Sequence, residues 1–241
     1  MHEPNPLAAV IRRWEQRSEL PAEDRKTVLA LPFVPRTLQR DSYLVREGEN
    51  TNACALLVSG FAYRQKLVAD GARQIISFHV PGEFVDLQNL LLHESDHNVQ
   101  ALTRVEVAFV TKSALLEAMA TSPAIQKAVW LDTLIDASIF REWVVNVGRR
   151  DARTKIAHLL CEFVVRARTA GVAEGMTCSF PLTQEHIADA TGLTSVHTNR
   201  TLQRLRRDGL IELAAGSLTV RDWDTLAGAG DFDELYLHHE A

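Results

Sequence analysis

The 241-residue chain has few cysteines, no long apolar run and no repeat or low-complexity tract. Its three cysteines, Cys54, Cys161 and Cys178, are too few and too scattered for a disulfide framework. The longest apolar tracts, such as residues 53–58, are strand-sized and fall far short of the roughly 18 residues of a membrane span. Residues 1–4 do not open a basic region followed by an apolar run, so no secretory signal is expected. These absences predict a cytoplasmic protein with no membrane partner.

The remaining composition is ordinary for a globular protein, with 46% hydrophobic and 24% charged residues, and it excludes disordered and collagen-like chains. The length allows one large domain or two small ones. The net charge of −5 is unevenly spread: residues 149–210 hold 10 basic and 6 acidic side chains, whereas residues 1–148 hold 15 and 18, and residues 211–241 hold 1 and 7. A basic segment in an acidic protein favours an anionic partner for that segment, although a solvated charged face has the same composition.

The N-terminal half changes from a helical to a strand pattern. Residues 1–32 predict short helices, because Pro21 followed by acidic residues is a good helix start. From about Phe33 the apolar period becomes two, and turn signals separate the runs. Strands are expected at residues 43–46, 54–59, 61–67, 76–80, 99–103 and 105–110. Many short strands at this spacing predict a sandwich or jelly roll over residues 33–111.

Residues 112–148 are helical by pattern. Ser122 and Pro123 form a good N-cap and N1 pair, and no helix breaker follows up to about Val147. The helix would be about 37 Å long at 1.5 Å per residue. Its apolar residues at heptad spacing predict a dimer seam, with burial inside one chain as the alternative. The residues expected at the seam are Leu131, Leu134, Ile135 and Ile139.

One pattern is more specific than the rest. Thr183 and Thr194 are good N-caps for short helices over residues 184–190 and 195–207. The turn between these helices has three residues and contains Gly192. Two short helices joined by such a turn are typical of a helix-turn-helix.

A hairpin predicted over residues 210–220 would form the wing of a winged helix. With a hinge near residues 148–151, the winged helix-turn-helix is expected to occupy residues 149–223. Residues 224–241 form an acidic tail with a small apolar anchor at residues 235–237, and the sequence suggests no function for it. The chain is thus predicted to be an α+β protein that combines a jelly roll, a long dimerisation helix and a winged helix-turn-helix.

The second helix of this motif suits DNA. Val196, Leu202 and Leu205 can pack inward, with exposure as the alternative for Val196 because it lies near the N-terminus of the helix. The polar side chains of the first two turns can reach base edges in the major groove. An arginine can donate two hydrogen bonds to guanine, and arginines further along the helix lie nearer to phosphates. The expected DNA contacts are Thr194, Ser195, Val196, His197, Asn199, Arg200, Arg204 and Arg206.

Three segments in the same order resemble the Crp/Fnr family of bacterial transcription regulators. Residues 187–200, Ile-Ala-Asp-Ala-Thr-Gly-Leu-Thr-Ser-Val-His-Thr-Asn-Arg, look like the helix-turn-helix of that family. Gly48 and Gly60 resemble its glycine pair, and Pro-Gly-Glu-Phe at residues 81–84 resembles the opening of its effector cassette. The resemblance covers roughly residues 33–222.

The resemblance implies a homodimer whose two recognition helices enter successive major grooves of double-stranded DNA. It also implies RNA polymerase as a further partner and no enzymatic activity. Arg200 falls at the family's guanine-reading arginine, whereas Ser195 and Val196 fall where well-known members carry Arg and Glu. Because valine cannot accept a hydrogen bond from cytosine N4, the half-site preference is expected to differ from theirs.

The cassette departs from the pattern of the cyclic-nucleotide-binding members. Those members hold the phosphate with an arginine and helix amides, and the ribose hydroxyl with a glutamate. Leu87 stands at the glutamate position, His97 stands at the arginine position, and Asp86 adds negative charge. A neutral histidine is a poor anion clamp, so a different small-molecule effector, or none, is expected. The candidate pocket residues are Phe84, Val85, Asp86, Leu87, Gln88, His97 and Asn98.

Other functions stay open on sequence grounds. They are a cyclic-nucleotide-responsive regulator, a signalling module whose winged helix binds protein, and a metal-dependent jelly-roll enzyme. The run His-Glu-Ser-Asp-His at residues 93–97 contains metal-ligand types, but it lies in a predicted loop. The cysteines do not form the N-terminal cluster of iron–sulfur members, and an isolated His79 on a strand is more typical of a structural residue than of a haem ligand. No metal or cofactor is therefore expected.

Overall fold

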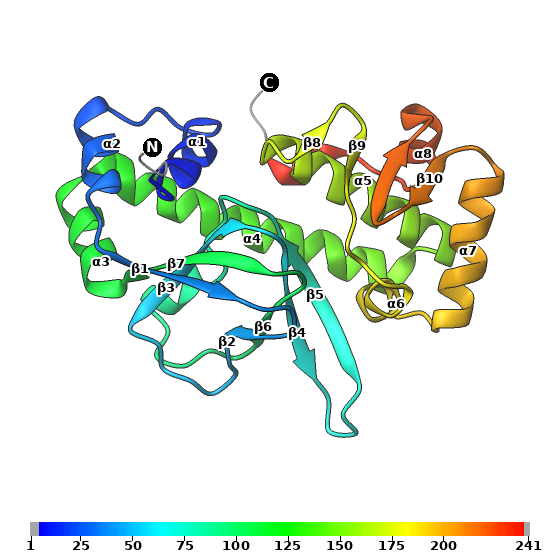
Figure 1. The fold of residues 1–241 in the computed structure, drawn as a ribbon, viewed down its shortest axis with the longest axis horizontal. Helices are drawn as coiled ribbons and strands as arrows, with labels where there is room; N and C mark the ends of the chain where they lie inside the picture. The colour runs from blue at the N-terminus through cyan, green and yellow to red at the C-terminus, as the bar shows by residue number, and fades with distance from the viewer. Residues whose placement is uncertain (1–4, 239–241) are drawn as a thin grey trace. The chain divides into compact units, whose positions relative to one another are not determined.

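The computed structural model describes residues 5–238 (Figure 1). Residues 1–4 of the predicted N-terminal segment and residues 239–241 of the predicted tail lie outside the described residues. The chain forms two compact units: the first contains the chain up to Gln65 and residues 79–137, and the second contains residues 66–78 and 138–237. None of the helices between residues 5 and 238 has the length and apolar character that crossing a bilayer requires.

The first unit is built on a β sandwich. One sheet has the strand order β1-β7-β3 and the other the order β2-β6-β4-β5, and the end of the β4–β5 hairpin over residues 66–78 belongs to the second unit. The strands are β1 (Phe33–Leu38), β2 (Tyr43–Val45), β3 (Ala53–Ser59), β4 (Ala62–Leu67), β5 (Arg73–His79), β6 (Asn98–Ala101) and β7 (Val105–Thr111). The predicted strands are confirmed, and β1 marks the start of the period-two pattern at Phe33.

Strand β3 is covered on both faces, which explains its continuous apolar sequence. Ala55 and Leu57 pack with residues of β6 and β7 between the sheets. Cys54 and Leu56 point the other way, into a cluster that includes Trp14. That second cluster is supplied by α1 (Ala8–Glu15), α2 (Ala22–Leu29), α3 (Lys112–Thr121), the 3-10 helix η1 (Leu87–Leu90) and the start of α4 (Pro123–Arg149).

Helix α4 has 27 residues and is about 40 Å long. The hydroxyl of Ser122 accepts a hydrogen bond from the backbone N–H of Ile125, so the predicted N-cap is confirmed. The helix continues through Gly148, which shortens the predicted hinge to two residues. Asp151 then caps α5 (Ala152–Thr169) by accepting a hydrogen bond from the backbone N–H of Thr154.

The second unit contains a helix-turn-helix and a four-stranded sheet of order β10-β11-β9-β8. Its elements are α5, β8 (Ala173–Glu174), β9 (Thr177–Ser179), α6 (Gln184–Thr191), α7 (Ser195–Arg207), β10 (Ile211–Ala214), β11 (Ser217–Val220), α8 (Trp223–Ala229) and η2 (Glu234–Leu237). The predicted hairpin is confirmed as β10–β11, whereas β8 and β9 are too short to carry a period-two signal. The described part of the acidic tail is structured, but only part of its predicted anchor is buried: Leu237 is buried and Leu235 is exposed.

Candidate nucleic-acid interface

Side-chain caps fix where the two helices of the motif begin. The hydroxyl of Thr183 accepts a hydrogen bond from the backbone N–H of His186, whose ring faces the Thr183 backbone in a capping box. The hydroxyl of Thr194 accepts one from the backbone N–H of His197 at 3.2 Å. Gly192 closes α6 with a φ of 65°, a left-handed conformation that favours glycine. The predicted caps and turn are therefore confirmed.

Helix α7 has one buried face and one exposed face, and it lies beside α6 with β10 next to it (Figure 1). Leu202 and Leu205 are buried as predicted, and Thr198 and Thr201 complete the inner face. Val196 is 70% exposed, so its methyl groups are free to contact another molecule. An exposed apolar side chain at the start of a polar helix face suits contact with a thymine methyl group.

The arginines of α7 are exposed and carry unbalanced charge. Within residues 5–238, Arg200, Arg204 and Arg206 form no ion pair with the protein. By contrast, Arg153 on α5 lies 2.6 Å from the carboxylate of Asp208. Arg200 and Arg204 lie one turn apart on the same face of α7, whereas Arg206 projects from another side of the helix, towards the β10–β11 hairpin. Unpaired guanidinium groups on the exposed surface of one helix favour an anionic partner there.

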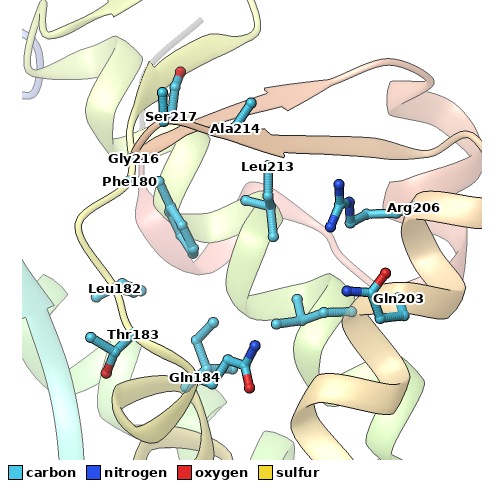
Figure 2. A pocket seen from close by; sticks show the side chains of 13 residues that line it. Phe180, Leu182, Thr183, Gln184, Gln203, Arg206, Leu213, Ala214, Gly216 and Ser217 are labelled. Atoms are coloured by element: carbon cyan, nitrogen blue, oxygen red, sulfur yellow. The ribbon is translucent and has the colours of Figure 1, made fainter.

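A pocket of about 330 Å³ lies between the start of α6, the middle of α7 and the β10–β11 hairpin. Figure 2 shows the side chains of Gln184, Gln203 and Arg206 directed into it, with Phe180 and Leu213 along its upper side in this view. The guanidinium of Arg206 and the amide nitrogens of Gln184 and Gln203 can donate hydrogen bonds into the pocket, which suits a phosphate group.

Comparison with known proteins identifies the family. The model of the Crp-like helix-turn-helix domain matches residues 154–229, and that of the cyclic nucleotide-binding domain matches residues 35–122. The chain is 30% identical over 181 residues to the transcriptional activator protein FnrL of Cereibacter sphaeroides, which covers 74% of this chain and 72% of FnrL. The chain belongs to the Crp/Fnr family of DNA-binding transcription regulators.

Other relatives agree with this Crp/Fnr assignment. The transcriptional activatory protein AadR of Rhodopseudomonas palustris is 30% identical over 190 residues, or 77% of this chain and 78% of AadR. The solved structure of FixK2 from Bradyrhizobium japonicum shares the fold, with a TM-score of 0.75 and 24% identity over 83% of this chain and 98% of FixK2.

The predicted effector cassette of this Crp/Fnr protein is largely filled by its own side chains. Phe84, Val85 and Leu87 are buried among hydrophobic core residues. Asp86 is also buried, and its carboxylate accepts a hydrogen bond of 2.9 Å from the backbone N–H of Ala55. Burial raises the pKa of Asp86 to about 7.

The two polar candidate residues His97 and Asn98 also have partners within the protein. The Nδ1 atom of His97 lies 2.7 Å from the Asp96 carboxylate, and its Nε2 atom lies 3.3 Å from the Gln88 amide nitrogen. Burial lowers the pKa of His97 to about 4, so its ring is uncharged at neutral pH. Asn98 accepts a hydrogen bond from the backbone N–H of Glu47.

An arginine that the sequence analysis did not select lies beside this cassette. Arg64 on β4 is 3% exposed, donates a hydrogen bond to the Val85 carbonyl at 2.7 Å, and lies 2.8 Å from the carboxylate of Asp136 on α4. Burial alone would raise the pKa of Asp136, but the charge of Arg64 holds it below its ordinary value. A strand with one solvated face leaves every second side chain exposed, whereas β4 is buried on both sides from Ala62 to Gln65, and Arg64 with it. In the sequence, the two acidic residues Asp132 and Asp136 in a mostly apolar helix were the signal that could have indicated a buried cationic partner such as Arg64.

Helix α4 presents an apolar stripe to solvent. Trp130, Leu134 and Val144 are 46%, 58% and 72% exposed. They fall on one heptad stripe, with Ala137 and Arg141 at the positions between Leu134 and Val144. Exposed aromatic and aliphatic side chains at this spacing are typical of a helix that packs against a partner.

This stripe differs from the predicted seam. Ile135 and Ile139 are buried within the chain, and Leu131 is half-buried. Of the four predicted seam residues, Leu134 alone lies on the exposed stripe. The two faces differ by about one residue, or about 100° around the helix.

The histidines considered as metal or haem ligands have other neighbours. Across residues 5–238, no three His, Cys, Asp or Glu side chains converge in a group that could hold a metal ion. The Nδ1 atom of His79 lies 3.1 Å from a carboxylate oxygen of Glu83. Both residues belong to the first unit.

Proposed function

We propose that this regulator binds an inverted-repeat operator as a homodimer, and that its effector, where it has one, is not a cyclic nucleotide. The observation that carries the DNA part is the exposed face of α7 with its unpaired arginines. Chemical complementarity to DNA and the match to the Crp-like helix-turn-helix support the same partner.

The contacts on DNA divide into base readers and phosphate contacts. We assign Arg200 as a guanine reader, because the first two turns of a recognition helix reach base edges. Ser195, Val196, His197 and Asn199 share those turns, and Thr194 caps them. We assign Arg204 and Arg206 to phosphates, with the pocket beside Arg206 as the seat of one phosphate.

The dimer seam is proposed on the exposed stripe of α4, through Trp130, Leu134 and Val144. A two-fold pair of helices would bury these side chains against their copies, which removes apolar surface from water. Half-sites about 34–36 Å apart follow from the pitch of B-DNA. In this proposal Ile135 and Ile139 support the seam from inside each chain.

The effector proposal rests on Arg64, Asp136 and His97. A cyclic phosphate needs a cation, but Arg64 already neutralises Asp136 and His97 is uncharged at neutral pH. The match to the cyclic nucleotide-binding domain model keeps a cyclic-nucleotide-responsive regulator as the second candidate. That ligand would have to displace the Asp136 carboxylate from Arg64.

We further propose a role for each predicted segment. These roles are N-terminal helices at 1–32, an effector domain at 33–111, helices that include the dimerisation helix at 112–148, a DNA-binding domain at 149–223 and an acidic tail at 224–241. Because relatives such as FnrL are named as activators of transcription, RNA polymerase is the further partner we propose. We propose a cytoplasmic location, because bacterial DNA and RNA polymerase are both in the cytoplasm.

Selection of bound sites from random double-stranded DNA tests this function. The expected result is enrichment of one inverted repeat, with a guanine in each half-site whose selection is lost in Arg200→Ala. Enrichment of a single asymmetric site would contradict the dimer, and no enrichment over unselected DNA would contradict sequence-specific binding.

A further inference from the structure

The chain continues beyond the matched helix-turn-helix domain, which ends at residue 229. We call residues 230–237 the C-terminal brace. Its acidic composition suggested no function at the sequence level. In the structure it contacts α5 and the two-residue hinge between α4 and α5, both in the second unit.

The centre of these contacts is a buried carboxylate, that of Glu162 on α5. It accepts hydrogen bonds from Nε1 of Trp143 on α4 at 3.0 Å, from Nη1 of Arg166 at 3.0 Å and from the hydroxyl of Tyr236 at 2.8 Å. A buried charge is stable only when its hydrogen-bonding capacity is filled. Tyr236 therefore completes a site that also joins α4 to α5.

The brace packs closely on His158, one turn earlier on α5. The rings of Tyr236 and His158 are stacked with centroids 5.7 Å apart, and Phe232 meets His158 edge-on at 5.2 Å. A Cβ atom on Gly230 would lie 2.7 Å from the backbone nitrogen of His158, so only glycine fits at this crossing. The C-terminal brace therefore packs against α5 at backbone-to-backbone distance.

The brace also reaches the hinge. Nη2 of Arg150 lies 2.6 Å from the carboxylate of Glu142 on α4 and 3.1 Å from that of Asp231 in the brace. Arg150 additionally donates a hydrogen bond to the Asp231 carbonyl at 3.2 Å. The hinge residue is thereby held between the end of α4 and the brace.

We propose that the C-terminal brace is a positioning element that holds α5 against the last turns of α4 and so fixes the helix-turn-helix, which packs on α5. Tyr236 and Asp231 are its positioning residues; neither is assigned a DNA contact. Burial and the charge of Glu162 raise the pKa of Tyr236 well above its ordinary value, so the phenol remains a donor at physiological pH. The consequence for operator binding rests on the function proposed above, whereas the bracing contact does not.

Trypsin cleavage of the native full-length protein after Arg149 and Arg150 tests the contact without DNA. Loss of a hydrogen bond to a charged group favours local opening by about tenfold to a hundredfold, so Tyr236→Phe should be cleaved faster by that factor. Gly230→Ala, which displaces the brace by a backbone clash, should do the same. Leu235→Ala changes an exposed side chain of the same segment and should be cleaved at the wild-type rate. Equal cleavage of all four proteins would overturn the bracing contact.

Binding to one and to two half-sites then tests positioning. Tyr236→Phe should lose about tenfold or more in affinity for the two-half-site operator and keep its affinity for a single half-site. Equal loss on both DNAs would mean that the helix-turn-helix itself is disturbed, and no loss on either would mean that the brace positions nothing; both results overturn the proposal. If the wild type binds no DNA, the proposed function is wrong, and the trypsin cleavage rates alone show whether the brace contacts α5 and the hinge as proposed.

Discussion

The guanidinium of Arg64 on β4 lies 2.8 Å from the carboxylate of Asp136 on α4, which joins the sandwich to the long helix through a largely buried ion pair. In a Crp/Fnr protein this places a cation beside the effector cassette and neutralises it with a residue of the same chain. The ion pair should therefore affect both the stability of the first unit and the charge of the ligands that the unit can bind.

Removing the acidic partner should destabilise the protein strongly. Asp136→Ala removes the carboxylate that forms an ion pair with the buried guanidinium of Arg64, and breaking a buried pair in this way costs about 3–5 kcal/mol. Because 31% of the Asp136 side chain is exposed, we expect a loss of about 3 kcal/mol, at the low end of that range. Urea unfolding followed by circular dichroism measures it. Glu23→Ala removes half of the exposed pair with Lys26 and should change stability by less than about 1 kcal/mol; a similar value for Asp136→Ala would contradict the burial of the pair.

The buried carboxyl of Asp86 should make stability depend on pH. Its pKa is about 7 when folded and about 3.9 when unfolded, so the folded state binds the proton more tightly. The free energy of unfolding should therefore fall as the pH rises from about 4 to about 7, and level off above that.

The variant Asp86→Asn isolates this effect, because its side-chain oxygen can still accept the hydrogen bond from Ala55. It should be more stable than the wild type at pH 8, by up to about 4 kcal/mol, and the difference should shrink towards pH 4. Thermal unfolding across this range measures the difference. The exposed Glu117→Gln is the control and should show no such trend; an Asp86→Asn protein that is less stable at pH 8 would indicate a charged, well-solvated carboxylate.

Cyclic nucleotides should leave the protein unchanged. With Arg64 paired and His97 neutral, millimolar cyclic AMP or cyclic GMP at pH 7.5 should not alter the melting temperature. A ligand at 100 times its dissociation constant would add about 2.7 kcal/mol, which is a shift of several degrees. Such a shift, together with tighter operator binding, would favour the cyclic-nucleotide-responsive alternative.

Two arginines of α7 should behave differently on DNA. Arg200→Ala should cost about 1–3 kcal/mol on the selected operator and relax the preference at one guanine. Arg206→Ala should weaken binding to all sequences alike and reduce the salt slope by about 1. Binding titrations with the selected operator and with a scrambled DNA, each at several salt concentrations, distinguish the effects of the two substitutions. Arg36→Ala removes an exposed charge on β1 and is the control; equal effects of Arg200→Ala on both DNAs would contradict its role as a reader.

The exposed stripe of α4 should carry the dimer. Light scattering is expected to give about twice the chain mass of 26.9 kDa for the wild type. Leu134→Glu places a negative charge on the stripe between Trp130 and Ala137 and should yield monomers at micromolar concentration, because burying a charge at an apolar contact is unfavourable. Val34→Glu alters an equally exposed apolar residue on β1 and should leave the dimer intact. A monomeric wild-type protein would contradict the proposal that a dimer binds two half-sites.

What could be predicted from the sequence was set by local chemistry. Thr183, Gly192 and Thr194 act on backbone groups within three or four residues of themselves, so their pattern alone located the helix-turn-helix. The caps of α4 and the turns between the strands are equally local. The family resemblance added the order of the parts.

What could not be predicted depends on contacts between distant segments. The burial of Arg64 depends on partners far away in the sequence, among them Asp136, 72 residues later, and the Val85 carbonyl, 21 residues later. Ile135 and Leu134 are both apolar neighbours on α4, and only the packing of the whole chain decides which one is covered. The role of Tyr236 likewise depends on Glu162, which no sequence spacing connects to it.

The double coverage of β3 has a consequence for anyone who wishes to give this regulator a new sensory input. From Cys54 to Leu57 each side chain faces one of two cores, so a library that varies this strand should return few folded clones. Residues 34–37 of strand β1 are all exposed and should tolerate wide variation. Re-engineering would therefore begin at the exposed loop residues Leu91 and Leu92, beside the cassette, and leave β3 as fixed scaffold.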